Sequence, residues 1–121
     1  IVDDDDEMAR AVGLMLKLLD YTPTHFLGPR PAAQALLTGK RPALMVLDIN
    51  MPEVTGLDML EFLRRRPEWK NLPVIMLSSE AADVMVDKAM KLGADAYVMK
   101  PVTIEELEKA MAQAFYNHLE R

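Results

Sequence analysis

The sequence lacks cysteine altogether and holds only two histidines, His25 and His118. Without cysteine there are no disulfides, no thiolate metal sites and no cysteine nucleophile. Two histidines so far apart in the sequence are poorly placed for a zinc site. No apolar run approaches the roughly 18 residues that a membrane span needs, and no signal peptide is visible. We therefore expect a cytoplasmic protein that is not bound to a membrane.

The composition is that of one small globular domain. The chain has 121 residues, half of them hydrophobic and 27% charged, which fits a folded domain over residues 1–121 and argues against disorder. Its net charge of −5 disfavours nucleic acid as a direct partner, because phosphate binding needs a basic surface. The chain opens at Ile1 and Val2 with no initiator methionine. Two apolar residues are too few for a strand, so we expect the first strand to be truncated and the natural chain to start earlier.

Segments with the patterns of strands and of helices alternate along the chain, which predicts an α/β fold. Three continuous apolar runs, at residues 43–47, 73–77 and 96–99, are typical of strands that are buried on both faces of a parallel sheet. Shorter strands are expected at residues 1–2 and 24–27. Helical spacing of apolar residues, with capping and breaking residues, predicts the helices. They are expected near residues 6–20, 31–38, 57–66, 81–92 and 103–119. Five alternations of strand and helix indicate a doubly wound sheet with helices on both faces.

Chemically useful side chains follow four of the five expected strands. Asp3 and Asp4 follow the first, Asp48 the third, Ser78 the fourth and Lys100 the fifth. In such sheets the ligand site lies at the carboxyl ends of the strands. Clustered carboxylates with no histidine or cysteine favour Mg²⁺, and a lysine and a hydroxyl beside them suit a phosphoryl group. Asp48 would then be its covalent acceptor.

Each residue also has an ordinary structural interpretation. The acidic run 3–7 could cap and charge the first turn of a helix, Asp48 could be a turn residue, and Ser78 could be an N-cap. Lys100 alone could simply be solvated. Arg64 and the two arginines after it fit cations at a helix C-terminus. The arrangement of all the site residues at successive strand ends is what favours a functional site.

These motifs resemble the receiver domains of two-component response regulators over essentially the whole chain. The matching pieces are Val2-Asp3-Asp4, Asp48 to Pro52 with Gly56, Ser78-Ser79 and Lys100-Pro101. All four, in this order and at this spacing, form a specific pattern. The resemblance implies a flavodoxin-like sheet of five parallel strands in the order 2-1-3-4-5 with five helices on its two faces.

The resemblance also implies the roles of the acidic residues. Asp48 would accept a phosphoryl group from a histidine kinase or a phosphotransfer protein. Asp3, Asp4 and Asp48 would hold Mg²⁺, with Mn²⁺ as a substitute, and Asn50 would add its backbone carbonyl. Asn50 and Glu80 flank the site as in chemotaxis-type regulators, and would influence how fast the phosphoryl is lost.

The remaining implied roles concern switching. Lys100 would pair with the phosphoryl oxygens, and the Lys100-Pro101 peptide bond would be cis. Ser78 would move toward the phosphoryl, and Tyr97 would change rotamer with it, although Tyr97 could also be an ordinary buried strand tyrosine. The surface formed by residues 81–92 and 95–109 would bind an effector or an output domain, or pair two copies in a homodimer.

Two other functions share parts of this pattern. A small-molecule phosphatase with an aspartyl-phosphate intermediate would need a second aspartate two residues after Asp48, where Asn50 cannot transfer a proton. A flavodoxin-like electron carrier would need a neutral, hydroxyl-rich loop after the first strand, where this chain has four aspartates. We therefore expect a signalling phosphoacceptor, with only slow self-phosphorylation and dephosphorylation, and not an enzyme.

Overall fold

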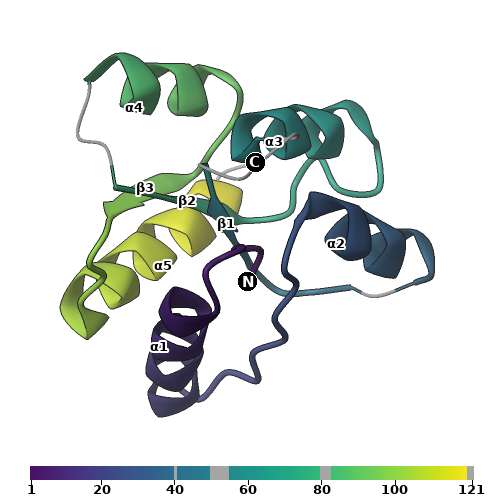
Figure 1. Ribbon diagram of the computed structural model, residues 1–121. Coiled ribbons are helices and arrows are strands. Elements are labelled where there is room, and N and C mark those ends of the chain that lie inside the picture. The colour runs from purple at the N-terminus through teal and green to yellow at the C-terminus, as the bar shows by residue number, and fades with distance from the viewer. Residues whose placement is uncertain (40, 50–54, 80–82, 120–121) are drawn as a thin grey trace.

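A computed structural model describes residues 1–39, 41–49, 55–79 and 83–119. Three strands form a parallel sheet in the order β1 (Met45–Asp48), β2 (Val74–Ser78) and β3 (Ala96–Met99). Five helices accompany the sheet (Figure 1). They are α1 (Asp6–Leu18), α2 (Pro29–Leu37), α3 (Gly56–Arg65), α4 (Asp83–Lys91) and α5 (Ile104–Leu119). The doubly wound α/β class is confirmed.

The two N-terminal strands are shorter than expected. Val2 forms isolated parallel bridges to Phe26 on one side and to Leu47 of β1 on the other. The segments therefore lie in the order 2-1-3-4-5, but within the described residues only three of the five are strands. The expected strand 24–27 is reduced to Phe26, because the chain bends at Leu27 and α2 begins at Pro29. Residues 1–2 precede the acidic run and offer too little backbone for a ladder.

The helices cover the sheet from both sides. Residues of α1 and α5 pack with Val46, Ile75 and Leu77 in one cluster, and residues of α2, α3 and α4 pack with Leu47 and Met76 in another. Neighbouring residues of one strand thus enter opposite clusters, as the two-residue period of a strand requires. Every residue of β1 and β2 is buried, which agrees with the continuous apolar runs in the sequence.

The helix boundaries follow their capping residues. Thr55 forms a capping box with Asp58 at the start of α3, and the Glu106 amide donates to Thr103 Oγ1 at 3.2 Å at the start of α5. Gly93, two residues after the end of α4, has a φ of +108°, a conformation that favours glycine. Among the described helices, none combines the length and the apolar character that crossing a membrane would require.

Candidate functional site

The predicted site residues come together at the carboxyl ends of the strands. Asp3 follows the bridge residue Val2, Asp48 ends β1, Ser78 ends β2, and Lys100 follows β3. Asp3, Asp48 and Ser78 are each at most 1% exposed. The Lys100 amide donates to the Ser78 carbonyl at 2.8 Å, which fixes the start of the segment after β3 against the end of β2. Parallel pairing therefore delivers all four residues to one edge of the sheet.

Lys100 pairs with two buried carboxylates. Its Nζ lies 3.2 Å from Asp3 Oδ2 and 3.2 Å from Asp48 Oδ1. Burial of the amine lowers the pKa of Lys100, but the charges of Asp48 and Asp3 outweigh burial and raise it above the ordinary 10.5. The ammonium group therefore stays charged at neutral pH and balances part of the negative charge of the site.

Three carboxylates meet closely enough to share a metal ion. One oxygen from each of Asp3, Asp4 and Asp48 lies within 4.8 Å of the others. Asp3 Oδ2 is buried, and apart from the Lys100 ion pair it has no hydrogen-bond partner among the described residues. Asp4 is exposed, so the cluster opens to solvent on that side. A small cluster of hard oxygen donors fits Mg²⁺, and Mn²⁺ accepts the same ligands.

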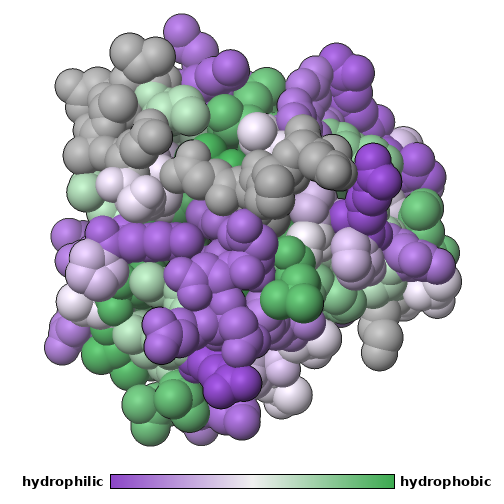
Figure 2. All heavy atoms as spheres, viewed as in Figure 1, coloured by the Kyte–Doolittle hydropathy of each residue, from purple (hydrophilic) through white to green (hydrophobic). Residues whose placement is uncertain are grey.

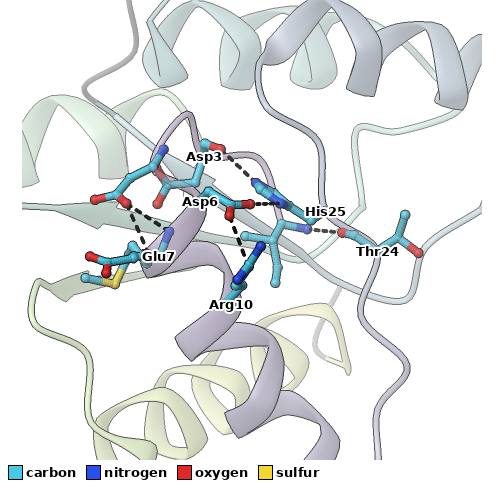
Figure 3. Close-up of polar contacts among 9 residues, drawn as sticks. Asp3, Asp6, Glu7, Arg10, Thr24 and His25 are labelled. Atoms are coloured by element: carbon cyan, nitrogen blue, oxygen red, sulfur yellow. Dashed lines mark hydrogen bonds and ion pairs between the residues drawn. The ribbon is translucent and has the colours of Figure 1, made fainter.

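The rest of the acidic run has structural roles. Asp5 is the N-cap of α1, and its side chain accepts hydrogen bonds from the amides of Glu7 and Met8. Asp6 pairs with Arg10 at 3.0 Å (Figure 3). Hydrophilic side chains consequently gather over the start of α1 (Figure 2). Within the run, Asp5 therefore caps α1, while Asp3 and Asp4 lie in the carboxylate cluster.

Gly56 supports Asp48 through a very close backbone contact. A Cβ built on Gly56 would lie 2.1 Å from the Asp48 carbonyl oxygen and 2.9 Å from the Ile49 Cα. The Gly56 amide also donates to the Ile49 carbonyl at 3.0 Å. Only glycine allows the first turn of α3 to approach the end of β1 this closely. The sequence marks Gly56 as part of a motif, but the contact that requires it is tertiary.

The expected switch residues lie on one face of the sheet. Ser78 is in register with Met99, and Tyr97 precedes Met99 by two residues on the same strand. Side chains two residues apart on a strand project to the same face. Tyr97 is half-buried and packs against the cluster that includes α4 residues. The Lys100–Pro101 peptide bond is cis, the isomer that the resemblance implies.

A groove runs over β3 between α4 and α5. Its lining comes from α4, from β3 and from α5, and it includes Met90, Tyr97, Met99, Glu106 and Lys109. Met90 and Met99 are more than 40% exposed, so the groove presents apolar surface. The groove overlaps the surface expected at residues 81–92 and 95–109 and extends beyond it to Ala110 and Gln113. Residues 81–82 of that surface lie outside the described residues.

Two predicted site positions cannot be placed. Asn50, expected to offer its backbone carbonyl, and Glu80, expected to modulate phosphoryl loss, lie outside the described residues. Their roles stay predictions.

The sequence and the fold both match known proteins. Residues 1–112 match the sequence model of the response regulator receiver domain. The chain is 33% identical over 115 residues to the chemotaxis protein CheY of Pseudomonas aeruginosa, covering 95% of this chain and 93% of that protein. It is 34% identical over 107 residues to the protein RcaC of Microchaete diplosiphon, covering 88% of this chain but only 16% of RcaC.

Two solved structures show the same architecture. The chemotaxis protein CheY4 of Vibrio cholerae superposes with a TM-score of 0.84 at 26% identity, covering 93% of each chain. A putative response regulator from Chloroflexus aurantiacus superposes with a TM-score of 0.87 at 27% identity, covering 99% of this chain and 94% of that one. Similarity extends both to proteins of this size and to one segment of a much longer protein.

Proposed function

Because the chain belongs to the response regulator receiver family of two-component systems, we propose that it is a switch operated by phosphorylation of Asp48. The observation that carries the proposal is the geometry around Asp48. Its carboxylate is buried at the end of β1, beside a second buried carboxylate, and is paired with Lys100 at 3.2 Å. The proposal includes a signalling role in the cytoplasm, in place of substrate turnover.

The proposed reaction moves one phosphoryl group. An Asp48 carboxylate oxygen forms a bond to phosphorus while the P–N bond to the phosphohistidine of a kinase or a phosphotransfer protein breaks. The electron pair of that bond returns to the imidazole nitrogen, and Asp48 becomes an acyl phosphate. Lys100 remains charged throughout. Its ammonium group lies close enough to Asp48 to stabilise the negative charge of the phosphoryl group that Asp48 would carry.

Asp3, Asp4 and Asp48 are the described residues that would hold Mg²⁺, or Mn²⁺ in its place. The chemistry supplied by the bound ion is neutralisation of negative charge on the phosphoryl oxygens. Asp3 contributes a buried and rigid ligand, since its Oδ1 accepts the Asp5 amide at 2.9 Å while its Oδ2 faces Lys100. Asp4 contributes an exposed ligand on the side from which the ion and the phosphoryl donor must enter.

We further propose that the site communicates with the groove over β3. A new phosphoryl group on Asp48 would attract the Ser78 hydroxyl and Lys100. Because Tyr97 lies on the same face of the sheet as Ser78, its side chain would then repack. The surface formed by residues 81–92 and 95–109 would then change its affinity for an effector, an output domain or a second copy of the chain. The exposed methionines Met90 and Met99 suit a partner-binding surface of this kind.

Intact mass after incubation with acetyl phosphate tests the proposal. We expect a gain of one phosphoryl group that requires Mg²⁺ and is lost in Asp48→Ala. The matched control is Asp87→Ala, which removes an exposed carboxylate of α4 and should label like the parent. Labelling of a folded Asp48→Ala variant at the parent's level would show that the acceptor is another residue. Sustained hydrolysis of simple phosphate esters would instead indicate a phosphatase.

A further inference from the structure

His25 contacts the main chain of Asp3 from the segment that precedes α2. Its Nε2 lies 2.9 Å from the Asp3 carbonyl oxygen, and its side chain is 25% exposed (Figure 3). None of the motifs that point to the site includes His25. The contact nevertheless reaches Asp3, a buried residue of the carboxylate cluster that directly follows the bridge residue Val2.

The His25 side chain replaces a missing rung of the sheet. The Phe26 amide donates to the Ile1 carbonyl at 2.8 Å, and the Asp3 amide donates to the Phe26 carbonyl at 3.1 Å. In a regular parallel ladder, the Asp3 carbonyl would next accept the amide of residue 28. The chain bends at residues 27–28 before α2, and the imidazole of His25 faces that carbonyl instead.

The imidazole has a carbonyl oxygen on one side and a carboxylate on the other. A carbonyl oxygen can only accept, so Nε2 must carry the proton in this contact. The other ring nitrogen, Nδ1, faces Asp6 Oδ1 at 3.8 Å, and Asp6 is itself paired with Arg10 (Figure 3). The ring therefore lies between the first turn of α1 and the Asp3 carbonyl, and its hydrogen bond is to Asp3.

We propose that His25 is a positioning residue for the carboxylate site, an inference that rests on the function proposed above. With His25 in place, both the amide and the carbonyl of Asp3 have partners in residues 25–26. The Asp3 carboxylate then has little freedom, because Oδ1 accepts the Asp5 amide and Oδ2 faces Lys100. Removing a group that hydrogen-bonds to a metal-ligating residue and so orients it typically weakens metal binding by about 10- to 100-fold.

The Mg²⁺ affinity of the unphosphorylated chain, measured by isothermal titration calorimetry, tests this role. We expect His25→Leu to weaken Mg²⁺ binding about 10-fold. In His25→Gln, the side-chain amide can take the place of Nε2 and donate to the Asp3 carbonyl. We therefore expect that variant to stay within about threefold of the parent. Should His25→Leu fail to fold, His25→Asn replaces it. The asparagine amide would lie near the position that Nδ1 has in the parent, too far away to reach the Asp3 carbonyl.

A matched control removes a similar bond away from the site. Thr38 Oγ1 donates to the Ala35 carbonyl at 2.9 Å at the end of α2, so Thr38→Val should leave Mg²⁺ affinity unchanged. Parent affinity in a folded His25→Leu variant would overturn the proposal, as would equal losses in the Gln and Leu variants. If the parent itself binds no Mg²⁺, the metal site of the proposed function fails, and the positioning role fails with it.

Discussion

The ammonium nitrogen of Lys100 lies 3.2 Å from Asp48 Oδ1, although the two residues belong to segments separated by the whole of β2 in the sheet. Lys100 follows β3 and Asp48 ends β1, so their contact spans the strand between them. The same ammonium group reaches Asp3 beside the first bridge. Three segments of the sheet thus depend on one cation, and removing a site charge should change stability as well as chemistry.

We predict that Lys100→Met destabilises the fold. The variant leaves Asp3 and Asp48 buried without their cation, and breaking a buried ion pair by removing one partner costs about 3 kcal/mol or more. If the proposed metal site exists, Mg²⁺ should restore part of this loss, because it would bind the same carboxylates in the folded state only. Urea unfolding with and without Mg²⁺ measures both effects.

The control for this prediction is Lys109→Met, which removes an exposed lysine of α5. It should change the free energy of unfolding by no more than about 0.5 kcal/mol. Equal stability of the two variants would mean that the Lys100 ion pairs contribute little to folding.

The same ion pairs should make stability depend on pH in the alkaline range. The pKa of Lys100 is lowered by burial but raised further by Asp48 and Asp3, so it lies above its unfolded value of 10.5. A raised pKa means that the folded state holds the proton more tightly. The stabilisation is therefore complete below the unfolded pKa and disappears as pH rises through the folded pKa. The stability difference between the parent and Lys100→Met should be constant from neutral pH to about 10 and shrink above it.

Replacing Gly56 by alanine should damage the end of β1. The new Cβ would lie 2.1 Å from the Asp48 carbonyl oxygen, which is backbone and cannot turn away. Overpacking of this kind costs about 1–3 kcal/mol or more, and it should also displace Asp48, the proposed phosphoacceptor. Gly28→Ala is the matched control, because a Cβ there meets nothing within 4 Å and the backbone is extended. Unfolding curves measure the expected loss of stability, and acetyl phosphate labelling measures the expected loss of phosphorylation. Both losses should appear in Gly56→Ala and neither in Gly28→Ala.

Much of the fold could be predicted because its signals are local. The buried strands are continuous apolar runs, and the helices carry caps and helical periodicity, so all five helices and the three paired strands lie where expected. The polar residues after the strands could be placed at one edge because parallel strands end together. The short first two segments were harder, since whether Val2 and Phe26 form a ladder or a single bridge depends on their neighbours in space.

What the sequence could not indicate are contacts whose partners are far apart in the chain. The pattern places Asp3 directly after the first expected strand, but nothing in it singles out His25 as a partner of Asp3. The arginines that end α3 are a further example. They look alike in sequence and were expected to act as cations at a helix C-terminus, but Arg64 turns inward and Arg65 does not.

Arg64 binds three parts of the chain at the amino ends of the strands, opposite the ends that carry the site. Its Nε donates to the Gly93 carbonyl at 2.9 Å, and one terminal nitrogen donates to the Leu72 carbonyl at 2.8 Å. The other terminal nitrogen pairs with Asp95 at 3.1 Å, and the Asp95 carboxylate also accepts the Val74 amide at 2.9 Å. The Asp95 side chain is completely buried, so it depends on these donors.

We therefore predict that Arg64→Met lowers the free energy of unfolding by about 3–5 kcal/mol, the usual result of leaving one charge of a buried pair behind. Arg65→Met is the matched control on the adjacent residue. Its arginine pairs with Glu61 on the surface with 76% of the side chain exposed, and such pairs contribute less than about 1 kcal/mol. Denaturant unfolding of both variants measures the contrast. If they lose the same stability, the buried pair with Asp95 does not hold α3 to the start of β2. Because Arg64 lies at the opposite end of the strands from Asp48, the Arg64→Met protein that remains folded should still accept phosphate at Asp48.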